Sequence, residues 1–179
     1  MVERAAYDVI RELEQQFHQN SRALPAQVDY KPRMVVLCFR IVDTDLVIPL
    51  DQVAEVQELP DYTPLPRVKA WMLGVAAIRG KLVPIVDLAG FLGDKKRPVS
   101  KYQRIVVVAL QSGYLGLLVD SVIGVRHFES DQYSETDKAA PPLVESYVHG
   151  CFIEEVGQPK YMFRPFKLIE DERFCNLAL

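Results

Sequence analysis

This sequence of 179 residues lacks an excess of basic residues, and cysteines and long apolar runs are scarce in it. The formal net charge is −3, so the basic excess that is typical of nucleic-acid-binding proteins is missing. The three cysteines, Cys38, Cys151 and Cys175, are far apart, form no CxxC pair and are odd in number. They indicate no disulfide framework, and they favour a reducing compartment.

No segment has the length or composition that a membrane span or a signal peptide requires. The longest uninterrupted apolar run, WMLGVAAI at 71–78, is far shorter than the roughly 20 residues that cross a bilayer. The N-terminal stretch MVERAAYDVIRELEQQ is charged throughout and lacks the apolar core of a signal peptide. We therefore expect a cytoplasmic protein that does not insert into a membrane.

The motifs of the common catalytic chemistries are missing as well. The sequence has no HExxH or CxxC metal motif and no GxSxG nucleophile elbow. RGKLVP lacks the second glycine and the Ser or Thr of a phosphate-binding loop. The histidines His18, His127 and His149 are too dispersed to suggest a metal centre. We expect a protein that is not an enzyme and holds no cofactor or metal.

Three aspartates are the best candidates for acid–base chemistry, but their positions favour a structural role. Asp51, Asp87 and Asp120 each follow an apolar run and precede a short segment that is typical of a helix or a turn. An aspartate at such a place accepts hydrogen bonds from backbone N–H groups. We therefore expect all three carboxylates to cap helices rather than to act in catalysis.

By composition the chain has three parts. Residues 1–33 are expected to form an amphipathic helix over 2–19 and then a linker that contains two prolines. The apolar face of this helix would consist of Ala6, Val9, Ile10, Leu13 and Phe17. It packs either on its own domain or on a partner. Residues 34–169 form the main domain, and residues 170–179 are a C-terminal tail.

The main domain consists of short runs rich in β-branched residues. They are separated by DTD, RGK, QSG and proline-containing turns, which is typical of all-β proteins. The runs are MVVLCFRIV, LVIPL, LVPIV, RIVVVAL and YLGLLV. Two short helices are expected over DQVAEVQEL and DLAGFLG, because each begins with an aspartate suited to N-capping.

An internal repeat relates the two halves of the main domain. A shift of 69 residues places 37–59 on 106–128. The matched pairs include Asp51 with Asp120, Val53 with Val122, Val56 with Val125 and Leu46 with Leu115. A weaker match at a slightly larger shift relates 73–92 to 149–169. Each half therefore predicts a small barrel of about five strands.

The repeat also decides how two cysteines are interpreted. Cys151 follows His149 closely, which suggests a Cys/His nucleophile. However, Cys151 matches Val75 in the first half, so it occupies an apolar strand position. We expect Cys151, and likewise Cys38 in its β run, to be small core residues.

The segment IRGK predicts a tight hairpin between two strands of the first half. Gly80 supplies the positive φ that such turns require. Arg79 precedes it, and its planar guanidinium can bind a carboxylate, for which Glu55 is a natural candidate. An exposed pair would contribute about 0–1 kcal/mol, whereas a half-buried pair would fix the register of two elements. Alternatively, Arg79 is a surface residue without a fixed contact.

The stretch GVAAIRGKLVPIVDL at 74–88 resembles a known family. Its pattern G-V-x-x-I-R-G-x-x-V-P-I-V-D-L is similar to the signature of CheW-like chemotaxis adaptors. The order of elements and the duplicated barrel agree, and the resemblance extends from Met34 to Leu168. LPRVKAWMLGVAAIRGKLVPIVDLAGFLG and the long N-terminal extension resemble most the members that act in type IV pilus twitching motility.

This resemblance implies a mainly β fold of two intertwined five-stranded SH3-like barrels, with an N-terminal helix and short connecting helices. It implies a non-enzymatic adaptor that couples a methyl-accepting chemoreceptor to a CheA-type histidine kinase. The pathway would control twitching motility, with general flagellar chemotaxis as the alternative. Such a protein is cytoplasmic and is recruited to membrane-associated receptor arrays.

The resemblance also implies two binding surfaces. The CheW-like regulatory domain of the kinase would meet one face of the first barrel, and the cytoplasmic tip of the receptor would enter a hydrophobic groove between the barrels. The residues matched to the receptor surface are Val53, Arg79, Arg104, Ile105 and Val106. Those matched to the kinase surface are Glu55, Leu73 and Gly74. Because side chains alternate along a strand, only one of Ile105 and Val106 should face outward on a given side.

Two departures from the family pattern and one rival function remain. Ala76-Ala77-Ile78 stands where the family usually has a polar Thr-Asn pair, and Pro165 within KYMFRPFKLI implies an edge strand or a bulge. The rival is an SH3-like module that binds a linear peptide or a small ligand. It would require an aromatic-lined groove, whereas Tyr62, Trp71 and Tyr102 are scattered in the sequence.

Overall fold

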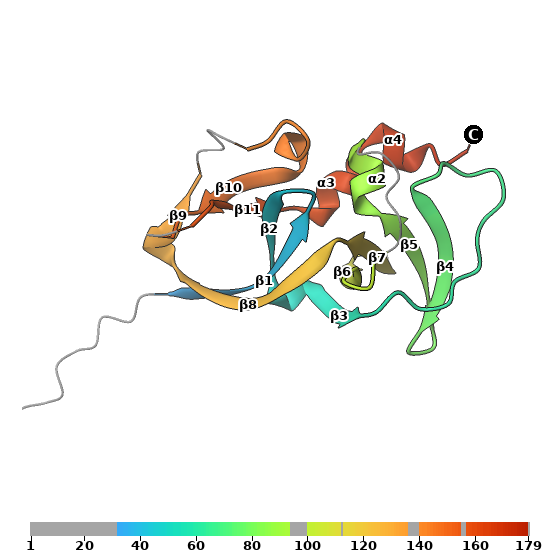
Figure 1. Cartoon of the computed structure of the whole chain (residues 1–179), viewed down its shortest axis with the longest axis horizontal. Helices are drawn as coiled ribbons and strands as arrows, with labels where there is room; N and C mark the ends of the chain where they lie inside the picture. Colours follow the sequence, from blue (N-terminus) through green and yellow to red (C-terminus); the bar gives the residue numbers. More distant parts are fainter. Residues whose placement is uncertain (1–31, 94–99, 112, 136–139, 155–156, 179) are drawn as a thin grey trace, which may run out of the picture. The chain divides into compact units, whose positions relative to one another are not determined.

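The protein is described by a computed structural model that covers residues 32–93, 100–111, 113–135, 140–154 and 157–178. The amphipathic helix expected over 2–19 lies outside these residues. Two β-sheets with short helices between the strands make up the described part (Figure 1). Within it, no helix combines the length and apolar character that crossing a membrane requires.

The first sheet has the strand order β8-β1-β2-β11-β10-β9. Its strands are β1 (Arg33–Ile41), β2 (Thr44–Pro49), β8 (Ser121–Glu129), β9 (Tyr133–Ser134), β10 (Val148–Phe152) and β11 (Lys160–Phe163). The second sheet has the order β3-β6-β7-β5-β4. Its strands are β3 (Val53–Gln57), β4 (Met72–Ile78), β5 (Lys81–Asp87), β6 (Arg104–Leu110) and β7 (Gly113–Val119). The helices are η1 (Leu50–Gln52), α2 (Leu88–Leu92), η2 (Ser130–Gln132), η3 (Glu145–Tyr147), α3 (Pro165–Glu170) and α4 (Glu172–Cys175).

The two halves of the repeat exchange strands. β1 and β2 belong to the first half but lie in a sheet with β8–β11, whereas β6 and β7 of the second half lie with β3–β5. The exchanged strands join their hosts through two parallel pairs, β2 with β11 and β5 with β7, and two antiparallel pairs, β1 with β8 and β3 with β6. The prediction of two intertwined SH3-like barrels is therefore confirmed. We call the barrel of the first sheet the first barrel and that of the second sheet the second barrel, so the barrel expected from the first half, with β3–β5, is the second barrel. The two-residue strand β9 is an addition to the five strands expected in each barrel.

Three hydrophobic clusters hold this arrangement together. A central cluster takes residues from both sheets and both halves, including Phe39, Leu46, Val106, Leu117, Phe163 and Leu168. Each sheet also has a smaller outer cluster. Val36 and Cys38 of one outer cluster match Ile105 and Val107 of the other through the repeat, so the repeat is present in the packing as well as in the sequence.

One of the two predicted helices is wrong. DLAGFLG does contain α2, but DQVAEVQEL forms only the 3₁₀ turn η1 and then the strand β3. Along β3, half-buried and exposed residues alternate, with Glu55 half-buried and Val56 exposed. β3 pairs with the valine-rich β6, so tertiary pairing overrode the helix-start signal at Asp51.

The prediction for Pro165 is also wrong. β11 ends at Phe163, and Pro165 occupies the first turn of α3, after Arg164 as the N-cap. Proline is well suited to this position, because its fixed φ is helical and its missing N–H would have no partner within the helix. The segment KYMFRPFKLI is therefore a strand followed by a helix.

The three aspartates differ in role. The Asp87 carboxylate caps α2 as predicted and accepts a hydrogen bond from the Gly90 backbone N–H at 3.1 Å. The prediction for Asp51 is wrong, because it lies inside η1, which has no side-chain cap. The Asp120 carboxylate also accepts a hydrogen bond from a backbone N–H. The donor is Val42 in the β1–β2 turn, at 2.6 Å, and not a residue of a helix.

Candidate functional site

A two-residue turn positions Arg79 at one end of the second barrel. β4 and β5 pair antiparallel up to Ile78 and Lys81, which leaves only Arg79 and Gly80 in the loop. Both have positive φ, 49° for Arg79 and 75° for Gly80. Two positive φ values in a two-residue hairpin loop are those of a type I′ turn. The tight hairpin predicted from IRGK is confirmed.

The predicted partner of Arg79 is also correct. Arg79 Nε lies 2.9 Å from Glu55 Oε2, and the arginine side chain is 75% exposed while that of Glu55 is 18% exposed. The pair is therefore buried at its carboxylate end and open at its guanidinium end. Because the contact runs through Nε and the arginine side chain is largely exposed, the guanidinium is accessible to a partner.

Around this pair lies a pocket of about 200 Å³, which we call the Arg79 pocket. It is lined by Ala54, Glu55, Ile78, Arg79, Lys81, Val83, Val107 and Tyr114. Lys81 Nζ lies 4.0 Å from the centroid of the Tyr114 ring, so the rim carries a second cation beside Arg79. A small apolar floor with two cations and one carboxylate suits a charged protein surface better than a reaction centre.

The other residues matched to the kinase surface lie on β4. Leu73 is half-buried against the outer cluster of the second sheet. Gly74 is buried, because Thr63 forms two backbone hydrogen bonds with Val75, of 2.8 and 2.9 Å, across it. A Cβ on Gly74 would lie 2.2 Å from the Thr63 carbonyl oxygen. Gly74 therefore lets the loop before β4 lie directly on the strand.

The remaining residues matched to the receptor surface are on β3 and β6. Val53 is half-buried against the central cluster. Arg104 donates through Nη1 to the carbonyls of Lys101 and Gln103, at 2.8 and 2.7 Å. Its Nη2 lies 3.4 Å from Glu58 Oε1.

Ile105 and Val106 are both fully buried. As alternation requires, they enter different clusters, but both faces of β6 are covered, so the expectation that one of them faces outward is wrong. Their burial argues against direct contact with a receptor.

Three exposed aliphatic residues on edge strands were not among the predicted site residues. Val56 lies on β3, and Ile123 and Val125 lie on β8; all three are exposed. β3 and β8 are edge strands of the two sheets, and Figure 1 shows both along the lower side of the described part. The repeat could have indicated two of them. It matches Val56 with Val125, so the same exposed position carries a valine in both halves. We call these three residues the edge-strand surface.

The catalytic candidates have structural environments. Cys38 and Cys151 are buried, as predicted, and burial raises the pKa of the Cys38 thiol to about 11. A thiol with such a pKa is a poor nucleophile at neutral pH. In the part of the chain that the structure describes, no cluster of His, Cys, Asp or Glu is arranged to hold a metal ion. Trp71 packs on Phe91 and Phe174, so it does not line a peptide groove.

Comparison with known proteins gives consistent matches. The family model described as CheW-like domain matches residues 35–173. Protein PilI of Pseudomonas aeruginosa is 35% identical over 173 residues, which are 97% of this chain and 96% of PilI. Protein FrzA of Myxococcus xanthus is 35% identical over 68% of this chain and 72% of its own length. The crystal structure of the scaffolding protein TtCheW from Thermoanaerobacter tengcongensis has a TM-score of 0.67 at 22% identity, covering 74% of this chain and 90% of that one.

Proposed function

Because this chain belongs to the family of CheW-like scaffolding adaptors, we propose that it couples a methyl-accepting chemoreceptor to a CheA-type histidine kinase. Members of this family are scaffolds rather than enzymes, which agrees with the lack of catalytic motifs in the sequence. The observation that carries the proposal is the Arg79–Glu55 pair at the hairpin end of the second barrel, because Arg79 lies within the motif on which the family resemblance rests.

The two surfaces would have different partners. The Arg79 pocket presents charge on a firm β-hairpin, so it suits the CheW-like regulatory domain of the kinase, and Leu73 and Gly74 lie on the same strand as Ile78. The edge-strand surface presents Val56, Ile123 and Val125, so it suits an apolar face of a helical receptor tip. Val53 and Arg104 would support that surface, while Ile105 and Val106 would act only through packing.

Arg79 and Glu55 were matched to different partners, yet they form one ion pair. We therefore expect a substitution of either residue to affect both kinase and receptor coupling. Glu55 fixes the guanidinium on the kinase side, and its neighbour on β3, Val56, belongs to the receptor side, so the ion pair would connect the two surfaces.

A pilus chemosensory pathway is the favoured setting. The match with PilI includes nearly the whole chain, whereas the match with FrzA includes 68% of it. The N-terminal region that distinguishes this chain from shorter CheW-like proteins is thus shared with PilI. General flagellar chemotaxis is the alternative, and restoration of twitching or of swimming in the matching deletion strains would separate the two.

The test is reconstitution of the full chain with its cognate kinase and the receptor tip. Wild type should join both partners, and Arg79→Glu should reduce co-sedimentation and kinase coupling about tenfold while its melting temperature stays near wild type. Glu172→Lys, an equal charge reversal at an exposed residue of α4, is the matched control and should bind normally. Failure of the wild type to join either partner would refute the adaptor function.

A further inference from the structure

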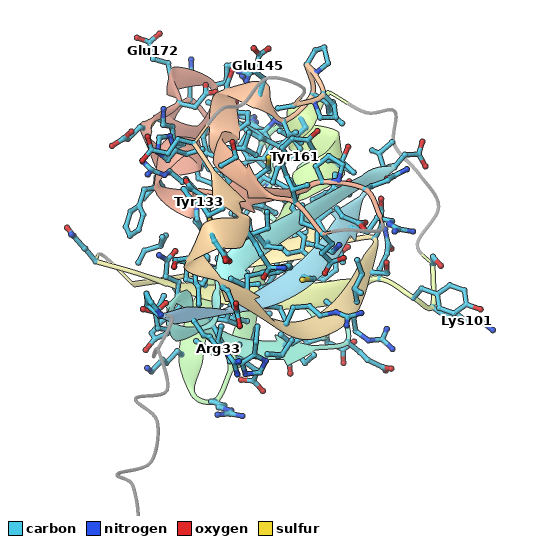
Figure 2. All side chains as sticks on the ribbon, turned by 90° about the vertical axis from the view of Figure 1, so that its left-hand side faces the viewer. Arg33, Lys101, Tyr133, Glu145, Tyr161 and Glu172 are labelled. Carbon is cyan, nitrogen blue, oxygen red and sulfur yellow. The ribbon has the colours of Figure 1, made fainter. Side chains whose placement is uncertain are left out.

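A groove in the first barrel shares no residue with either surface described above. Its volume is about 770 Å³, within the range of ligand-binding sites. It is lined by the start of β1, the end of β2, η1, η2, the strands β9, β10 and β11, and α3. Figure 2 looks onto this side of the molecule and shows Arg33 and Tyr133 on the near face.

The groove is apolar at its floor and on two of its walls. Phe152, Met162 and Phe163 are buried at the floor. Met34 on β1 and Phe166 on α3 stand on the rim, where they are 44% and 38% exposed. With Tyr133 these residues give the aromatic lining that a peptide-binding module requires, at a place that the sequence did not indicate.

The rim is positively charged. Arg33, Arg164 and Lys167 contribute three cations, against Glu170 as the one anion among the lining residues. Arg33 forms an exposed pair with Glu129 at 3.2 Å. Arg164 and Lys167 have no ion-pair partner among the residues that the structure describes. A ligand with carboxylates beside its apolar groups would therefore complement this groove.

An open strand edge borders the groove. β1 begins at Arg33 and pairs with β8 from there onward, but its pairing with β2 begins only at Val36, opposite Pro49. Within the described residues, the edge of Arg33–Val35 that would face β2 therefore has no strand beside it. Such an edge offers main-chain hydrogen bonds to an extended peptide, while the adjoining pocket accepts its side chains.

We propose that this groove binds an extended peptide segment of a further partner protein, with apolar anchor residues and acidic flanks. The strand edge gives the peptide its direction, Met34 and Phe166 enclose its anchors, and Arg164 and Lys167 attract its carboxylates. A scaffold with such a groove could recruit a third protein without giving up its other two surfaces.

The test uses the full chain and a synthetic probe. The probe is a fluorescein-labelled peptide of about ten residues, with two leucine anchors and flanking glutamates. Its fluorescence anisotropy should rise to saturation with added protein. Phe166→Ser should weaken binding about tenfold, and Lys167→Glu should weaken it and reduce its dependence on salt. A version of the peptide with lysines in place of the glutamates should bind at least about tenfold more weakly.

Two matched variants serve as controls. Leu82→Ser removes an apolar side chain that is 79% exposed outside the groove, and Lys101→Glu reverses an exposed charge outside it. Neither should change the affinity for the probe. All four residues are exposed, so melting temperatures near wild type are expected and rule out unfolding as the cause.

Three outcomes would overturn the proposal. The first is equal loss of affinity in Phe166→Ser and Leu82→Ser. The second is equal binding of the glutamate-flanked and lysine-flanked peptides. The third is a dimer in sedimentation velocity that Phe166→Ser dissolves, because the groove would then be an interface between copies of this chain. None of these depends on Arg79, so failure here and failure of the adaptor function remain distinguishable.

Discussion

Arg79 holds Glu55 through Nε at 2.9 Å while its own backbone lies at a φ of 49°. Asparagine, aspartate and glycine adopt this left-handed region far more readily than arginine. The arginine is therefore kept at a position where the turn itself favours other residues. Backbone strain of this kind is found at functional sites, and it makes the contribution of Arg79 to stability separable from its contribution to binding.

Arg79→Asn should separate these two contributions. It creates an Asn-Gly type I′ turn, which favours the hairpin, and it removes an ion pair that is open at its guanidinium end and worth about 1 kcal/mol. The two effects oppose each other, so the free energy of unfolding should stay within about 1 kcal/mol of wild type. Binding to the kinase or receptor should nevertheless be lost. A chemical denaturation curve and a pull-down check this; a clearly destabilised variant that still binds would make Arg79 a structural residue.

Gly74→Ala should release the loop that lies over β4. The new Cβ would meet the Thr63 carbonyl oxygen at 2.2 Å, so the Thr63–Val75 hydrogen bonds should break, at a cost of roughly 1–3 kcal/mol. Gly113→Ala is the matched control, since Gly113 has a similar φ, 144° against 151°, but no atom within 4 Å of its added Cβ. Thermal unfolding of both variants checks this. Equal losses would mean that φ, and not the close approach of Thr63, decides the effect.

The hairpin and the ion pair could be predicted because turn chemistry is local. Gly80 follows Arg79 directly. Glu55 was proposed as a carboxylate of the same half, and it lies on β3, at the opposite edge of the second sheet from β4. The burial of Ile105 and Val106 could not be predicted in this way. Alternation places them on opposite faces of β6, but only the exchange of strands between the halves decides that both faces are covered.

The same limit applies to the groove of the first barrel. Pro165 was expected in a strand, so α3 was missed, and with it the wall that carries Phe166. Met34 and Phe166 are far apart in sequence, and only the exchange of strands places them around one cavity. No pattern in a single sequence carries that information.

Asp120 supports a second strained residue, Val42, which has a φ of 56° in the β1–β2 turn. The Asp120 carboxylate accepts the Val42 N–H at 2.6 Å, and a hydrogen bond to a charged acceptor contributes about 1.5–3 kcal/mol. Asp120→Ala should therefore destabilise the protein by roughly that amount. Val42→Gly relieves the strained φ. In the Val42→Gly background, Asp120→Ala should therefore lower the free energy of unfolding by less than it does in the wild type. Denaturant unfolding of the four proteins measures this coupling, and strictly additive losses would contradict it.

Asp171 connects the C-terminal segment to the rest of the domain. Its carboxylate binds Arg173, with Arg173 Nη2 at 2.9 Å from Oδ2, and it accepts from the Tyr147 hydroxyl. The same segment stacks Phe174 on Trp71 and joins the Leu177 carbonyl to the Lys69 N–H at 3.1 Å. Loss of the Asp171 charge should therefore loosen the contact between the C-terminal segment and the loop before β4.

Stability should depend on pH through Asp171. Hydrogen bonds from Arg173, and then from Tyr147, hold the pKa of the Asp171 carboxyl well below its usual range. Because the folded-state pKa is lowered, the stabilisation is complete above the unfolded value of about 4 and is lost as the pH falls from there toward the folded value. Asp171→Asn should therefore melt below wild type at pH 7, and the difference should shrink below pH about 4. Thermal unfolding between pH 7 and pH 3 tests this, with Asp61→Asn as the exposed-aspartate control. A gap that is constant over the whole range would show that the charge of Asp171 does not stabilise the fold.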